Sequence, residues 1–360
     1  MSNPIKQHNF SAGPAILPQS VMKEAAQAVK NFNGMGLSIL EISHRSAEFD
    51  AVAKEAESLV REIAGLDDSY AVLFLSGGAS TQFFMAPMNL LAENETAAYL
   101  DTGSWSSKAI KEAKNFGEVE VIASSKDRNY AYIPKRYKKP SGAVYLHLTS
   151  NNTIFGTQYH KFPDVEIPLI CDMSSDMFSR PFDANKFGMI YAGAQKNLGP
   201  AGVTLVIIKK DWVGRTGRTI PSMLNYQTHI DNDSMYNTPP VFPIYVLMLT
   251  LRWIKAKGGL VGVEKANKSK ARLIYKEIDE NPCFKGTVDT KDRSLMNVCF
   301  LPTRDEYTAP FLAMCKEAGI SGLKGHRSVG GFRASIYNAM PKNSVKALVE
   351  VMQAFAKKHA

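Results

Sequence analysis

The sequence predicts an α/β fold organised around a buried sheet, and two segments carry that prediction. One apolar run begins at Ile167 and ends in a carboxylate at Asp172, and a second run covers Val203–Ile208. Apolar runs of this length, bounded by Pro and Gly, are typical of buried strands. An aspartate at the carboxyl end of such a strand usually belongs to a binding site in an open α/β sheet.

The remaining elements follow from hydrophobic periodicity and from Gly and Pro punctuation. Apolar runs predict further strands at 70–75, 143–148, 296–301 and 331–335. Amphipathic patterns predict helices at about 18–30, 47–64, 81–91, 243–257, 263–280, 308–318 and 344–357. The paired glycines at 258 and 259 end one helix, and we expect a domain boundary there.

Composition limits the classes of function. The chain has 360 residues, 45% hydrophobic residues and a formal net charge of +9. A basic chain binds nucleic acid or handles anionic substrates. The basic run 135–139 is better explained as a solvated loop than as a surface that binds a nucleic-acid phosphate backbone, and no nucleic-acid-binding motif accompanies it.

The hydropathy of the chain and the spacing of its cysteines indicate its cellular setting. The most apolar stretch, 244–254, is too short to span a bilayer, and the N-terminus has no apolar signal core. The spacing of the four cysteines resembles no metal site, so we expect buried free thiols. We therefore expect a cytoplasmic protein with neither a membrane nor a nucleic-acid partner, and without a metal.

One lysine stands out among small residues. Lys196 lies in the segment Ala-Gly-Ala-Gln-Lys-Asn-Leu-Gly-Pro-Ala-Gly, between the run that ends at Asp172 and the run that begins at Val203. Either residue alone is better explained as a surface lysine or a helix-capping aspartate. Together they suit pyridoxal 5'-phosphate (PLP), because a lysine amine forms a Schiff base with its aldehyde and an aspartate keeps its ring nitrogen protonated.

This lysine segment resembles that of the phosphoserine aminotransferases, fold-type I PLP enzymes of the class-V aminotransferase family. The resemblance extends along essentially the whole chain. It implies a large α/β domain at 17–258 that has a mainly parallel central sheet and binds PLP. It also implies a small α+β domain made from the N-terminal arm, 1–16, and from 259–360.

The resemblance assigns further cofactor contacts. The turn Ser-Gly-Gly-Ala-Ser joins a predicted strand to a helix start, and this arrangement binds anions. By resemblance, Ala79 and Ser80 of this turn contact the cofactor phosphate, although many relatives have Arg in place of Ser80. The remaining contacts are Trp105, stacked on the ring, Thr153 at the ring hydroxyl, Gln195 at the phosphate, and Asn237 and Thr238 from the neighbouring subunit. Without the resemblance, Ala79 and Ser80 are explained as part of a turn, Trp105 as a core residue and Thr153 as part of a loop. Asn237 and Thr238 are explained as helix caps.

The predicted substrate contacts are basic. Arg333 interrupts a small, apolar strand, so its charge must either find a partner or reach a site. The resemblance assigns Arg333 to the substrate α-carboxylate. It places His326 and Arg327 at the distal phosphate, beside His44 and Arg45 of the other subunit. This assignment implies a homodimer with composite active sites.

The implied reaction transfers an amino group between glutamate and 3-phosphohydroxypyruvate, giving 2-oxoglutarate and O-phosphoserine for serine biosynthesis. The resemblance also suggests a phosphorylated 2-oxo-3-hydroxybutanoate of pyridoxine biosynthesis as a second substrate. Two classes of alternative remain at this stage. The first is another fold-type I PLP enzyme, such as an aminotransferase of small acids or a cysteine desulfurase, although no cysteine lies in the flexible, polar loop that a desulfurase needs. The second is a non-catalytic basic binding protein.

Overall fold

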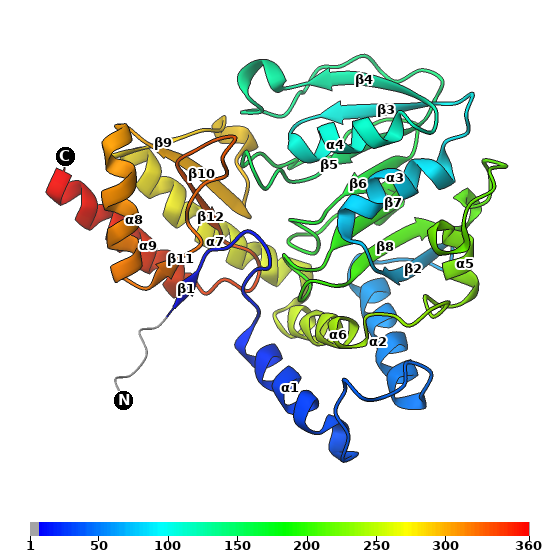
Figure 1. Ribbon diagram of the computed structural model, residues 1–360. Helices are drawn as coiled ribbons and strands as arrows, with labels where there is room; N and C mark the ends of the chain where they lie inside the picture. Colours follow the sequence, from blue (N-terminus) through cyan, green and yellow to red (C-terminus); the bar gives the residue numbers. More distant parts are fainter. Residues whose placement is uncertain (1–6, 360) are drawn as a thin grey trace.

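A seven-stranded sheet forms the centre of the molecule (Figure 1). The computed structural model describes residues 7–359. The strand order is β2-β8-β7-β6-β5-β3-β4, and β8 alone in this sheet runs antiparallel to its neighbours. The strands are β2 (Tyr70–Leu75), β3 (Thr96–Asp101), β4 (Glu118–Ser124), β5 (Ala143–Thr149), β6 (Leu169–Asp172), β7 (Phe187–Gly193) and β8 (Thr204–Lys209). This is the mainly parallel α/β sheet that the sequence analysis predicts.

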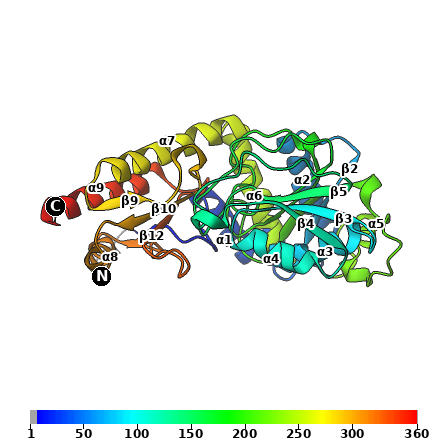
Figure 2. The ribbon, with the colours of Figure 1, turned by 90° about the horizontal axis from the view of Figure 1, so that it is seen from above.

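Helices cover both faces of this sheet, which explains why its central strands are continuous apolar runs. Alternate residues of β2 enter different cores. Leu73 packs in the core on the side of α3 (Gly78–Leu90) and α4 (Ser104–Ala113), whereas Phe74 packs with α2 (Ala47–Ala64) and α6 (Val241–Ala256). Figure 2 shows α3 and α4 on one side of the sheet and α2 on the other.

Local signals place the ends of several helices. Ser46 caps α2 by accepting a hydrogen bond from Phe49 N, and Gly65 ends it in the left-handed region at φ 66°. The sequence analysis predicts the same bounds for this helix. The other helices of the large core are α1 (Gln19–Lys30) and the short α5 (Tyr226–Asp231).

Several details of the large core differ from the sequence-based expectations. Helix α3 begins at Gly78 rather than at residue 81, because the turn glycines adopt positive φ and the chain enters the helix within the turn. Strands β4 and β7 and helices α4 and α5 are not among the elements predicted from sequence, and β7 lies between β6 and β8 in the sheet.

A smaller antiparallel sheet, in the order β12-β10-β9, packs against helices in the C-terminal part of the chain. Its elements are α7 (Gly259–Glu280), β9 (Phe284–Gly286), β10 (Asn297–Pro302), α8 (Thr308–Glu317), β11 (Ile320–Ser321), β12 (Phe332–Ser335) and α9 (Lys342–His359). Strand β1 (His8–Asn9) pairs with β11, and Phe10 enters the core of this part.

Helix α7 contributes to both large and small cores. Val263 packs with the large core, whereas Ala271, Ile274 and Ile278 pack with the small one. The division of the chain at residues 258 and 259 stays a prediction. Among residues 7–359, no helix combines the length and hydropathy that crossing a bilayer requires.

The four cysteines are buried free thiols, as the sequence analysis predicts. Burial raises the pKa of Cys299 to about 12 and that of Cys171 well above its ordinary value. The basic run 135–139, by contrast, is only partly a solvated loop. Lys135 Nζ lies 2.6 Å from Oδ1 of the fully buried Asp292 and so ties this loop to the C-terminal part.

Candidate active site

The candidate site lies where the parallel strands of the large sheet end. Asp172 is the last residue of β6 and pairs in register with Tyr191 of the neighbouring strand β7. Lys196 follows the end of β7, and Thr153 follows β5. The carboxyl ends of adjacent parallel strands meet at one edge, where ligands bind in open α/β sheets.

The amine of Lys196 lies in a crowded, half-buried position. Its Nζ donates to Thr153 Oγ1 at 2.8 Å and lies 5.9 Å from the centroid of the Trp105 ring. Burial lowers the pKa of Lys196 to about 8, and the charge of Arg333 acts in the same direction, while Asp172 and Asp176 oppose it. A substantial share of this amine is therefore neutral near pH 8, and the neutral amine is the form that attacks an aldehyde.

Asp172 is a buried carboxylate with a defined orientation. It is 4% exposed, and its Oδ1 accepts a hydrogen bond from Ser174 N at 2.9 Å. Burial raises its pKa, while Lys196 and Ser174 oppose the rise. A carboxylate held in this way, close to a reactive amine, can stabilise a proton on a ring nitrogen.

Trp105 is held in place by the turn before α4. Ser106 Oγ accepts hydrogen bonds from Thr102 N and Gly103 N, which fixes the backbone that leads to the tryptophan. The indole Nε1 is buried and has no hydrogen-bond partner among residues 7–359. A buried donor without a partner indicates that this position is shaped for a group that the chain itself does not supply.

The start of α3 has the features of a helix N-terminus that can bind an anion. Gly77 and Gly78 have φ values of 99° and 69°, and the first turn of the helix has neither a side-chain cap nor an acidic residue. Its N–H groups and its dipole thus remain available for an anion. Ala79 and Ser80 lie in this first turn.

Gln195 joins the lysine segment to the N-terminal arm. Its backbone oxygen accepts a hydrogen bond from Ala15 N at 2.9 Å. A Cβ added to Gly13 would lie 3.5 Å from Lys196 Cγ and 3.6 Å from Gln195 Cγ. The arm therefore passes directly over this segment.

Arg333 reaches the site from the small sheet. It pairs in register with Cys299, and its N–H donates to Leu323 O at 2.8 Å. Its Nε is buried without a hydrogen-bond partner among the residues that the structure describes. The effect of its charge on the pKa of Lys196 places the guanidinium and the amine in one electrostatic environment.

A group of positive charges lies beside Arg333. Burial lowers the pKa of His326, and the charges of Arg333, Arg327 and Lys108 lower it further. Lys108 also lies over the Trp105 ring, with Nζ 4.6 Å from the centroid. The sequence analysis does not single out Lys108, although its position three residues after Trp105 on one helix places the two on the same face.

The other four predicted residues come from two segments that lie outside the strands of the sheet. His44 and Arg45 lie in the segment before α2, apart from the small sheet that carries Arg333 (Figure 1). Asn237 and Thr238 are exposed, and Asn237 lines a cavity of about 250 Å³ with Ser76 and Gly77. The sequence analysis expects all four to serve a neighbouring subunit.

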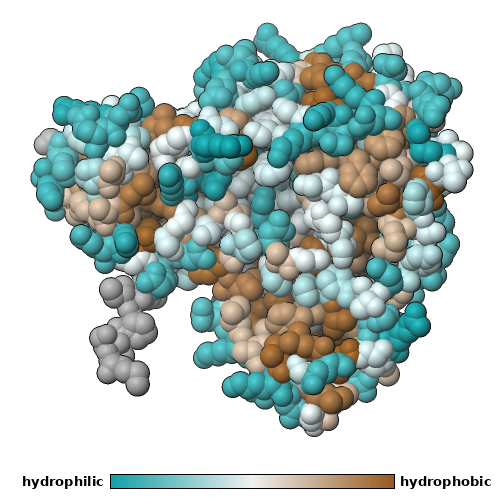
Figure 3. Space-filling model, viewed as in Figure 1, coloured by the Kyte–Doolittle hydropathy of each residue, from teal (hydrophilic) through white to brown (hydrophobic). Residues whose placement is uncertain are grey.

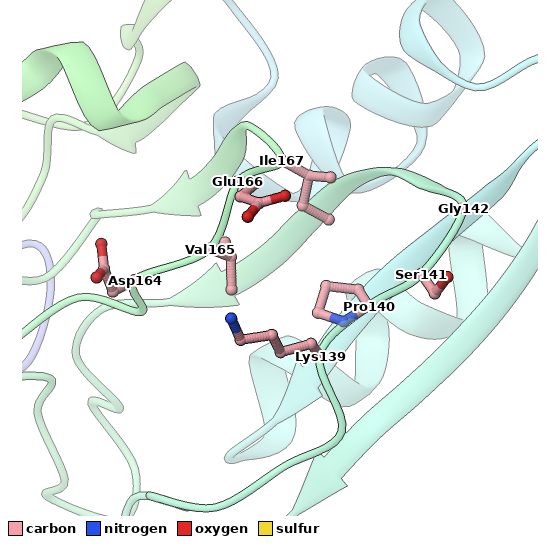
Figure 4. Close-up of a pocket in the computed structure, with 8 residues that line it drawn as sticks. All are labelled: Lys139, Pro140, Ser141, Gly142, Asp164, Val165, Glu166 and Ile167. Carbon is pink, nitrogen blue, oxygen red and sulfur yellow. The ribbon is translucent and has the colours of Figure 1, made fainter.

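A larger cavity, of about 550 Å³, lies elsewhere on the large sheet. Its lining residues are 139–142, just before β5, and 164–167, shortly before β6. Figure 4 shows the Lys139 side chain extending toward the 164–167 segment. These residues stand at the amino ends of the parallel strands, opposite to the edge that carries Lys196, and the cavity takes no part in the candidate site.

Taken together, the residues at this site fit PLP. The partly neutral lysine, the buried carboxylate, the face of the indole and the glycine-bounded helix start suit its aldehyde, ring nitrogen, ring face and phosphate respectively.

Comparisons with known proteins show the family of the chain. A family model described as "Aminotransferase class-V" matches residues 7–348. A phosphoserine aminotransferase of Flavobacterium johnsoniae is 62% identical over 355 residues, covering 98% of this chain and 100% of the relative. The corresponding protein of Parabacteroides distasonis is 58% identical over 358 residues, covering 99% of this chain and 100% of that one.

Solved structures give the same result. The phosphoserine aminotransferase of Bacillus circulans subsp. alkalophilus matches with a TM-score of 0.96 and 50% identity, over 99% of each chain. The PLP-bound phosphoserine aminotransferase of Trichomonas vaginalis matches with a TM-score of 0.91 and 39% identity, over 97% of this chain and 100% of that one. The chain therefore belongs to the class-V aminotransferase family and, within it, to the phosphoserine aminotransferases, PLP-dependent enzymes of fold type I.

Proposed function

We propose that this chain transfers an amino group between glutamate and 3-phosphohydroxypyruvate, giving 2-oxoglutarate and O-phosphoserine in the cytoplasmic synthesis of serine. The observation that carries the proposal is the meeting of Lys196, Asp172 and Trp105 at one edge of the sheet, with Arg333 reaching them from the small sheet. PLP, when bound, supplies the carbonyl carbon that exchanges the amino group and a ring that accepts the electron pair of the substrate Cα.

The chain's own residues bind and orient that chemistry. The first turn of α3, with Ala79 and Ser80, binds the phosphate through backbone N–H groups, and Gln195 adds an amide donor. Thr153, whose Oγ1 accepts a hydrogen bond from Lys196 Nζ at 2.8 Å, would contact the ring hydroxyl. Trp105 would cover the ring face, and Asp172 would hold the proton on the ring nitrogen.

Lys196 moves the proton of the reaction. As a general base, its Nζ removes the proton from the substrate Cα. As a general acid, it then delivers that proton to C4′ of the cofactor. A pKa of about 8 suits both steps, because the amine exists in both protonation states near neutral pH.

The positive charges at the distal end set the substrate class. Arg333 binds the α-carboxylate that glutamate and O-phosphoserine share. His326 and Arg327, with His44 and Arg45 of the neighbouring subunit, bind the distal phosphate or γ-carboxylate. Both distal groups are anions, so one pocket serves both half-reactions.

We infer a homodimer from the residues that a single chain leaves apart. Hydrophobic side chains gather over the α1–α2 region on the face shown in Figure 3, where Met22, Met35, Leu37 and Leu40 are exposed. The same region carries His44 and Arg45, so a partner that covers it would receive them in its own site.

The reaction is tested with the purified protein and added PLP. We expect a cofactor absorbance band that changes on adding either glutamate or O-phosphoserine, and we expect Lys196→Ala to abolish turnover with both. A band that responds to glutamate alone would discard the phosphoserine assignment. Retained turnover in the variant would remove Lys196 from its role.

The dimer is tested by mixing two inactive variants, Lys196→Ala and Arg45→Ala, under conditions that exchange subunits. If the sites are composite, half of the dimers are mixed and each has one native site, so about 25% of native activity returns. Activity that stays at the level of the separate variants would mean that Arg45 acts within its own chain.

A further inference from the structure

A buried lysine on α7 has no role in the reaction described above. Lys270 is 2% exposed, and its Nζ donates to three backbone carbonyls: Ile336 O at 2.9 Å, Tyr337 O at 2.5 Å and Asn338 O at 3.4 Å. No ion pair with an acid reaches it within the described chain. Burial lowers the pKa of Lys270 to about 7, so the ammonium form is costly to bury, and the three carbonyl acceptors are the contacts that favour this form.

The three carbonyls that accept hydrogen bonds from Lys270 belong to the segment directly after β12. That strand carries Arg333, and the chain leaves it at Ser335. Three successive carbonyls that point to one place repel one another unless a cation or donor lies between them. Lys270 occupies that place from a different element, so it holds residues 336–338 in a backbone arrangement that the strand itself does not impose.

The same segment is joined to the segment of the reactive lysine. Asn338 N donates to the side-chain oxygen of Asn197 at 3.0 Å, and Asn197 is the residue after Lys196. The side chain of Asn338 donates to Phe178 O at 3.0 Å and accepts from Asn267 at 2.8 Å. Asn267 lies one helical turn before Lys270 and also donates to Ser179 O at 3.1 Å.

These contacts form a polar joint between the two hydrophobic cores. Its members are buried residues of α7 and of the segments 178–179, 197 and 336–338. One end of the joint is next to Lys196, and the other is a short distance along the chain from Arg333. A fixed joint therefore sets the distance between the amine of Lys196 and the guanidinium of Arg333, which binds the substrate carboxylate.

We propose that Lys270 is a positioning residue for the amino-transfer reaction, a tethered internal cation whose ammonium fixes residues 336–338 and thereby the placement of Arg333 relative to Lys196. The inference rests on the proposed roles of those two residues. Lys270 acts through them and touches neither substrate nor cofactor.

The test compares two lysines of one helix in the PLP-loaded enzyme. Lys270→Met removes the charge and keeps most of the side-chain volume. Lys268→Met removes an exposed lysine whose ion pair with Glu264 lies on the outer face, and it serves as the control. We expect Lys270→Met to lower kcat/KM for glutamate and for O-phosphoserine by about 10- to 100-fold, mainly through KM, since a misplaced binding group costs that much. The control is expected to match the native enzyme.

A second variant separates positioning from general stability. Lys270→Ala leaves a void that propylammonium fits, and we expect added propylammonium to restore part of the lost kcat/KM, whereas Lys270→Met, whose space is filled, gains nothing. The native enzyme measured with the same amine corrects for its direct reaction with PLP. A lower unfolding temperature with unchanged kcat and KM would overturn the proposal, as would equal behaviour of the two methionine variants. If the native enzyme itself shows no amino transfer, the proposed function fails instead.

Discussion

Replacing Arg333 by methionine tests how the substrate is recognised, because it removes the charge and preserves most of the volume. The guanidinium is half-buried, and its Nε has no partner among residues 7–359, so it is already partly desolvated before substrate arrives. Removing one partner of such a charged pair costs about 2–5 kcal/mol. That range corresponds to a loss in kcat/KM of about 30- to 5,000-fold.

The structure also predicts the pattern of this loss. Glutamate and O-phosphoserine share the α-carboxylate, so Arg333→Met is expected to reduce kcat/KM for both by a similar factor. Arg327→Met, at the distal end, is expected to separate the two substrates. Steady-state kinetics with each amino donor, at one pH and one ionic strength, gives both ratios.

A second readout is independent of turnover. The charge of Arg333 lowers the pKa of Lys196, so in the cofactor-free protein Arg333→Met raises that pKa above its native value of about 8. The pH dependence of the rate of PLP capture measures this pKa in the variant. Unchanged kcat/KM for both donors, together with an unchanged pH profile, would refute the placement of Arg333 in the site.

Capture of PLP by the cofactor-free native protein is expected to accelerate as pH rises through about 8 and then to level off, because deprotonation yields the attacking amine; stopped-flow absorbance measures it, and a rate independent of pH between 6 and 10 would contradict it. Asp292→Ala is expected to lower the free energy of unfolding by about 1–3 kcal/mol in denaturant titrations, because it leaves the buried Ile133 N–H without its acceptor; a change below 0.5 kcal/mol, the size of ordinary surface effects, would count against it. Ser46→Ala is expected to cost about 1 kcal/mol through loss of the α2 cap, whereas Ser46→Asp, which keeps a capping oxygen, is expected to stay near the native value.

Several features of this protein are already determined by local sequence. Helix α2 begins after a capping serine and ends at a left-handed glycine, and both signals lie within one turn of the helix end that they specify. Strand β2 is continuously apolar because both faces of the sheet are covered. Lys196, Asp172 and the glycine turn before α3 could be recognised because each sits in a short segment whose composition is unusual by itself.

Other features depend on contacts between distant segments, which no local pattern encodes. The order β2-β8-β7-β6-β5-β3-β4 and the reversal of β8 come from the packing of whole strands. Strand β7 escapes notice because its apolar run between two glycines is short, from Met189 to Ala192, and neighbours on both sides hold it in the sheet. Lys270 resembles any other lysine of a basic amphipathic helix until the fold brings residues 336–338 against it. The sequence by itself determined which side chains could perform amino transfer. Only the tertiary structure decided how far apart they stand, because those distances are set by packing between elements far apart along the chain.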